Sequence, residues 1–95
     1  MDRMYTLDQI RNNVSEIAVK YGVKSVYLFG SYAKELAGSQ SDIDLLIEKG
    51  LFQLAGFHLE LEERLSIKVD VLTLDNLSPD FLKEIRKDEV LLYER

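Results

Sequence analysis

The feature that most constrains the fold is a short apolar run, Leu45-Leu46-Ile47, inside the segment DIDLLIE. The segment favours a β-strand, and successive side chains of a strand point to opposite faces of its sheet. Three consecutive apolar residues therefore indicate a strand that is buried on both faces. Such a strand needs a layer of structure on each side, which predicts an α/β (α+β) domain with helices packed on a small sheet.

Helical and β-favouring segments alternate along the rest of the chain. Thr6 and Gln9 resemble a capping box, and the apolar residues that follow recur at helical spacing, which predicts a helix over 7–21 that ends at Gly22. The same reasoning predicts strands over 25–29, 42–48, 66–73 and 90–93, and helices over 32–36, over 51–65 and from Ser78-Pro79 onward.

Composition narrows the class of protein. The 95 residues predict a single domain over 1–95, and no apolar run is long enough to span a membrane. The net charge of −5 argues against a domain that grips nucleic acid directly, and it suits a basic protein partner or a ligand that brings cations. The chain has no cysteine, which excludes disulfides and thiolate zinc sites and fits a cytoplasmic location.

Two carboxylates open the buried strand, and a third lies in a later one. Asp42 and Asp44 are two residues apart, so on a strand they share a face with Cα atoms on the order of 6.5 Å apart. Asp70 is a lone acid in the β-favouring run KVDVLT, where Asp is unusual. If the two strands are neighbours, three carboxylates converge. Oxygen ligands of this kind suit Mg²⁺, and such a trio is the usual scaffold of a two-metal site.

A Gly-Ser pair stands where the strand over 25–29 is expected to end. Gly30 allows a tight turn, and the N–H groups that follow it can face a phosphate. Ser31 adds a hydroxyl donor, and Lys34 lies one helical turn further on as a positive charge. Asp-x-Asp follows this pair after ten residues, and Val-Asp-Val comes later in the chain. The whole pattern is far more specific than any one of these motifs alone.

The run GSYAKELAGSQSDID resembles the G-S-x(10)-D-x-D signature of the DNA polymerase β-like nucleotidyltransferase superfamily. With KVDVLT downstream, the chain is similar to the minimal nucleotidyltransferase (MNT) antitoxins that are paired with HEPN ribonuclease toxins. The resemblance implies an α/β fold with a mixed sheet, a nucleoside triphosphate substrate and Mg²⁺, with two metal sites. It also implies that AMP is moved from ATP to a tyrosine of the HEPN partner.

The resemblance also implies roles for particular residues. Gly30 and Ser31 match phosphate contacts, Asp42 and Asp44 match metal-binding acids, and Asp70 matches the third acid, taken as the base that activates the acceptor. Glu35 departs from the pattern, because many relatives carry glycine there. Its charge could weaken nucleotide binding near Lys34 or could point away from the site.

Two classes of function remain open at this point. The chain is either an adenylyltransferase that silences a partner protein, or a non-catalytic antitoxin that neutralises the toxin by binding and occlusion. A transferase for a small molecule such as an aminoglycoside ranks below both. Outside the motif, His58 on the apolar face of its helix is expected to be packed and hydrogen-bonded. Glu60, Glu62 and Glu63 are expected to form either a solvated helix face or part of an acidic docking surface for a basic toxin.

Overall fold

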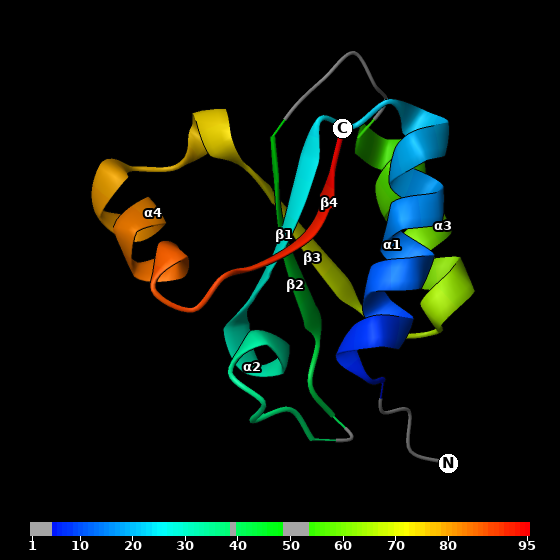
Figure 1. Cartoon of the computed structure of the whole chain (residues 1–95), viewed down its shortest axis with the longest axis horizontal. Coiled ribbons are helices and arrows are strands. Elements are labelled where there is room, and N and C mark those ends of the chain that lie inside the picture. The colour runs from blue at the N-terminus through cyan, green and yellow to red at the C-terminus, as the bar shows by residue number, and fades with distance from the viewer. Residues whose placement is uncertain (1–4, 39, 49–53) are drawn as a thin grey trace.

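The computed structural model describes residues 5–38, 40–48 and 54–95. Helices and strands alternate as the sequence predicts (Figure 1). In chain order they are α1 (Leu7–Tyr21), β1 (Ser25–Phe29), α2 (Gly30–Ala33), β2 (Ile43–Glu48), α3 (Leu54–Leu65), β3 (Val69–Thr73), the 3₁₀ helix η1 (Leu74–Asn76), α4 (Pro79–Arg86) and β4 (Val90–Glu94).

The four strands form one mixed sheet in the order β3-β2-β1-β4. Strand β1 runs antiparallel to both β2 and β4, whereas β2 and β3 are parallel. The mixed sheet and the α/β class are thereby confirmed. The parallel pair arises because α3 connects β2 to β3, and a crossover of this kind returns the chain in the same direction.

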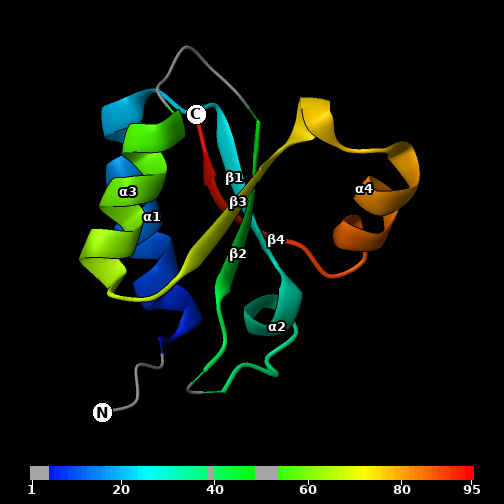
Figure 2. The same ribbon diagram turned by 180° about the vertical axis from the view of Figure 1, so that it is seen from behind.

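Helices α1 and α3 cover one face of the sheet, and α4 lies on the other side (Figures 1 and 2). Ile43, Leu45 and Ile47 belong to the core formed with α1 and α3, while Leu46 alternates to the opposite face. All of these side chains are completely buried, so β2 is covered on both faces as its apolar run predicts. No helix in the described part of the chain is long and apolar enough to cross a membrane.

Local chemistry sets most helix boundaries. The capping box is present, with the Thr6 hydroxyl accepting from the Gln9 N–H and the Gln9 side chain accepting from the Thr6 N–H. Helix α1 ends at Gly22 with φ 71°, and α4 begins with Ser78 as its N-cap. These three expectations are confirmed.

Two elements differ from the expected ones by more than one residue. Helix α2 occupies residues 30–33 instead of 32–36, because Glu35 at φ 60° has left the helical conformation. Strand β3 begins at Val69 instead of residue 66, because Ser66 at φ 55° ends α3 with a turn. The expected first residues of α3, 51–53, lie outside the described residues.

The capping box makes a prediction about stability. Replacing Thr6 with Ala removes the hydroxyl that accepts from the Gln9 N–H, and should lower the free energy of unfolding by about 1 kcal/mol in urea denaturation. The control Thr6→Ser keeps a hydroxyl at the same place and should stay close to the wild-type value. Equal losses in the two variants would show that the cap does not stabilise α1.

Candidate active site

The pairing of β2 with β3 brings the predicted acids together. Asp44 and Asp70 are register partners on these adjacent parallel strands, and Asp42 directly precedes β2. Their neighbours Ile43 and Val69 are completely buried on the side of α1 and α3, so the acids belong to the opposite face. The sequence predicted that the three acids converge if these two strands are neighbours, and the structure shows that the strands are paired.

Gly30 lies against the central acid of this group. Phe29, the last residue of β1, is the register partner of Asp44, and Gly30 follows with φ 75°. A Cβ atom at position 30 would stand 2.2 Å from Oδ2 of Asp44, closer than any real contact. Glycine is therefore required twice, by the left-handed backbone and by the close approach of the chain to the carboxylate.

The crowding of acids changes the proton affinity of Asp44. Its pKa is raised from 3.8 to about 6, mainly by burial and then, in decreasing order, by the charge of Asp70, a hydrogen bond with Asp70 and the charge of Asp42. The Lys68 ammonium offsets part of this, at 3.8 Å from Oδ2 of Asp42 and 3.9 Å from Oδ1 of Asp70. Lys68 was not predicted to belong to the site, although the alternation of side chains along KVDVLT places it on the same face as Asp70.

The donor set of the site fits a hard divalent cation, because all three side chains offer carboxylate oxygens. Across the described residues, however, no three His, Cys, Asp or Glu side chains are oriented to ligate one ion together. Asp42 and Asp70 instead point toward Lys68, and Asp44 shares a hydrogen bond with Asp70. The Lys68 ammonium and the raised proton affinity of Asp44 thus reduce the repulsion among the acids, as a bound cation would. Metal binding by the three acids stays a prediction.

Side chains of α3 fix the strand that carries Asp70. Because β3 is an edge strand, the N–H and C=O of Val69 have no neighbouring strand on one side. The Val69 N–H donates to Oε2 of Glu62 at 2.9 Å, and Nε2 of His58 hydrogen-bonds the Val69 carbonyl. The expected hydrogen bond of His58 is confirmed, although its side chain is 39% exposed, and Glu62 is partly exposed as expected but also accepts a hydrogen bond from the backbone. Their i, i+4 spacing on one helix face was the signal available in the sequence.

A cavity of about 190 Å³ lies beside Gly30, between β1, α2 and α4. Lys34 lines it, with Nζ 3.9 Å from Oδ2 of Asp88. Since Phe29 pairs with Asp44, the cavity is next to the acids on the same face of the sheet. Its lining residues are Phe29, Gly30, Lys34, Phe81, Glu84, Ile85 and Asp88.

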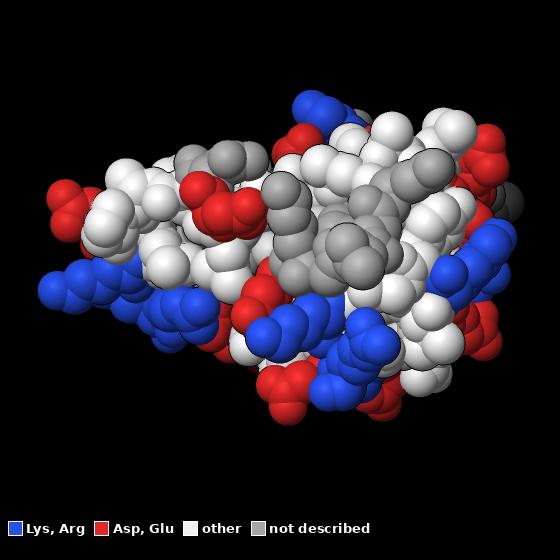
Figure 3. Space-filling view, turned by 90° about the horizontal axis from the view of Figure 1, so that it is seen from above, with Lys and Arg blue, Asp and Glu red and all other residues white. Residues whose placement is uncertain are grey.

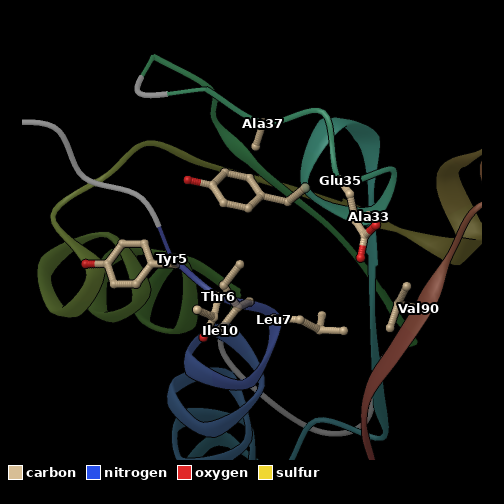
Figure 4. A pocket seen from close by; sticks show the side chains of 9 residues that line it. Tyr5, Thr6, Leu7, Ile10, Ala33, Glu35, Ala37 and Val90 are labelled. Atoms are coloured by element: carbon tan, nitrogen blue, oxygen red, sulfur yellow. The ribbon is translucent and has the colours of Figure 1, made fainter.

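Glu35 does not line this cavity. It lines a different one, next to the start of α1 (Figure 4). Of the two alternatives that the sequence left open for its charge, the structure supports the second, in which Glu35 points away from the cavity that contains Lys34 and Gly30.

Surface charges of both signs are interspersed. On the face shown in Figure 3, lysine and arginine side chains stand among aspartates and glutamates instead of forming one continuous basic surface. Lys20 pairs with Glu60 at 2.8 Å and Lys24 with Glu48 at 3.1 Å. This pattern differs from the one-sided basic surface typical of nucleic-acid-binding domains.

Comparisons with known proteins support the family that the sequence motifs resemble. The family described as "Polymerase beta, Nucleotidyltransferase" matches residues 12–95. A relative from Methanocaldococcus jannaschii, provisionally named a protein adenylyltransferase, is 38% identical over 89 residues, which cover 90% of each chain. A solved minimal nucleotidyltransferase superposes with a TM-score of 0.75 at 25% identity, covering 90% of this chain and 95% of the other. An MNT antitoxin solved with the tri-AMPylated HEPN toxin of Shewanella oneidensis gives a TM-score of 0.71 at 20% identity, covering 95% and 74%.

The raised pKa of Asp44 makes a prediction about pH. Between about pH 4 and pH 6 the folded chain keeps this proton while the unfolded chain has lost it, so this group lowers the free energy of unfolding as pH rises through that window. In metal-free buffer, Asp44→Asn should therefore unfold at a higher urea concentration than the wild type above pH 6, with the difference disappearing near pH 4. Glu63→Gln, which removes an exposed charge from α3, should keep a constant offset. A constant offset for Asp44→Asn as well would contradict the crowded site.

Proposed function

Because the chain belongs to the polymerase β nucleotidyltransferase family, we propose that it moves AMP from ATP to a hydroxyl group of a protein partner. The observation that carries this proposal is the convergence of Asp42, Asp44 and Asp70 on one face of the sheet, beside Gly30, which also lines a cavity. The relative from M. jannaschii, similar over nine-tenths of both chains, supports adenylyl transfer in particular.

The residues of the site divide into two groups in this proposal. Asp42, Asp44 and Asp70 would hold Mg²⁺, with two ions expected, and bound Mg²⁺ supplies positive charge that stabilises the attacking and leaving oxygens. The second group faces the cavity or borders it. There the Gly30 backbone and the hydroxyl of Ser31 contact the phosphates, and Lys34 contributes its positive charge.

The transfer itself is a displacement at the α-phosphate. The acceptor oxygen forms a bond to this phosphorus while the bond to the pyrophosphate oxygen breaks, and pyrophosphate leaves with the electron pair of that bond. Asp70 takes the hydroxyl proton from the acceptor as the new bond forms. The hydrogen bonds of His58 and Glu62 to Val69 keep Asp70 opposite Asp44 during this step.

We propose a HEPN ribonuclease toxin as the partner and one of its tyrosines as the acceptor, which makes the chain an antitoxin. The MNT antitoxin from S. oneidensis, which shares this fold, was solved with a tri-AMPylated HEPN toxin. The net charge of −5 also suits a basic partner.

The direct experiment measures the mass of the partner. The product of the gene next to that of this chain, which we propose to be the HEPN toxin, should gain one or more AMP units by intact-mass spectrometry after incubation with the chain, ATP and Mg²⁺. Asp42→Asn should abolish the gain, because it removes one of the converging carboxylates. A tight complex with no added mass would instead support the non-catalytic antitoxin that neutralises by occlusion.

A second experiment tests the cavity. Lys34→Ala should weaken ATP binding about tenfold or more in isothermal titration with Mg²⁺ present, because a charge-assisted contact contributes about 1.5–3 kcal/mol. The matched control is Lys83→Ala on α4, which makes the same change of charge outside the lining of the cavity. Equal effects of the two substitutions would assign the loss to net charge and contradict a specific contact.

A further inference from the structure

The main chain fixes Lys68 beside the acids. Strands β2 and β3 pair from Ile43 and Val69 onward, so Lys68 lies opposite Asp42, one step before the first pair of the ladder. The Lys68 carbonyl also accepts from the Ile43 N–H at 3.0 Å. Alternation toward β3 puts its side chain on the face that carries Asp70. The backbone of Lys68 is therefore anchored next to the acids, whereas its side chain is 67% exposed and can leave them without disturbing the core.

The Lys68 ammonium bridges the two outer acids of the site. Its Nζ lies 3.8 Å from Oδ2 of Asp42 and 3.9 Å from Oδ1 of Asp70, and its charge acts on Asp44 as well. Within residues 5–38, 40–48 and 54–95, no other lysine or arginine forms an ion pair with these acids. One ammonium therefore compensates three carboxylates.

The acids that face this ammonium are not arranged as metal ligands. In the described part of the chain, no three acidic side chains are oriented to ligate one ion, and Asp42 and Asp70 lie almost 4 Å from Nζ. Mg²⁺ needs its oxygen ligands at about 2.1 Å, so the carboxylates would have to close on the ion. An ammonium at the same place repels the ion, because the two charges have the same sign. The cation and the ammonium therefore compete for the same oxygens.

We propose that Lys68 is a resident counter-ion of the site, which a divalent cation must displace, so that Mg²⁺ binding and release of Lys68 are one coupled step. The inference rests on the proposed function, because it takes the three acids as the metal ligands. It assigns Lys68 two effects of opposite sign. The ammonium stabilises the metal-free fold by reducing the repulsion among the acids, and it weakens the binding of Mg²⁺ because it must first be displaced.

The first test measures Mg²⁺ binding without nucleotide by isothermal titration. Lys68→Met keeps a long apolar side chain without the charge, and we expect it to bind Mg²⁺ at least fivefold more tightly than the wild type. Lys68→Arg keeps the charge and should bind no more tightly than the wild type. The matched control is Lys24→Met, because Lys24 is an exposed lysine paired at 3.1 Å with Glu48 at the other end of β2. Its affinity should stay within about twofold of the wild type, because the lost charge is screened over that distance.

The second test compares urea unfolding in EDTA and in saturating Mg²⁺. Lys68→Met should unfold at a lower urea concentration than the wild type in EDTA, because the acids lose their counter-ion. In Mg²⁺ it should unfold at an equal or higher concentration, because the ion takes over this role and no ammonium opposes it. Lys24→Met should differ from the wild type by the same amount in both buffers. In the wild type, the ¹³Cε signal of Lys68 should move during the Mg²⁺ titration with the dissociation constant found by calorimetry, while that of Lys24 stays in place.

Several outcomes would overturn the proposal. Equal Mg²⁺ affinities of the wild type and Lys68→Met, an equally large gain in Lys24→Met, or the same loss of stability in both buffers would each contradict a displaced counter-ion. If these results came with AMP transfer by the wild type, only the role of Lys68 would fall. If neither the wild type nor Lys68→Met bound Mg²⁺, the three acids would not be a metal site, and this part of the proposed function would fall with the inference.

Discussion

The mutual repulsion of carboxylates on two parallel strands is the constraint on which the rest of this structure depends. Pairing β2 with β3 in parallel places Asp44 beside Asp70, with Asp42 next to them. Burial of Asp44 and the like charges beside it oppose folding, and its pKa is raised by burial first and by the neighbouring carboxylates second. The fold tolerates the arrangement because Lys68 lies between two of the acids and because the core beneath β2 is completely buried.

The arrangement that costs stability is also the arrangement that suits catalysis. A site that binds divalent cations needs converging negative charge before the cation arrives, and a cation bound only by the native state returns the lost stability. The edge of the sheet at Val69 is held by Glu62 and His58, so the strand that carries Asp70 cannot easily slip relative to Asp44. The helix on one face thus stabilises the geometry of the acids on the other.

Helix α2 is short, but it separates two environments. Its first residue, Gly30, lies against Asp44 on the acidic side, where a side chain would collide. Tyr32 faces the cavity beside α1, and Glu35 follows the helix into the same cavity. Helix α2 therefore separates the side of the sheet that carries the acids from a cavity beside the start of α1.

Much of this was determined by the sequence alone. Residues 7–21 carry a capping box and a glycine stop, and the strands over 25–29 and near 43–48 follow from local chemistry and hydrophobic pattern. The Gly-Ser, Asp-x-Asp and Val-Asp-Val pattern was enough to indicate the family and the acids. Boundaries near Glu35 and Ser66 were missed, because their left-handed conformations are not favoured by either residue type.

Tertiary structure decided everything that depends on neighbours distant in sequence. That β3 pairs with β2 rather than with another strand, that Lys68 faces Asp42, and that Glu62 reaches Val69 are results of strand order and helix packing. The cavity around Tyr32 combines residues from α1, α2 and β4, which no local pattern connects. The sequence by itself determined which groups this protein has for its chemistry, because residue type and spacing are local properties. Only the fold determined which of them meet, because proximity between distant segments depends on how the whole chain packs.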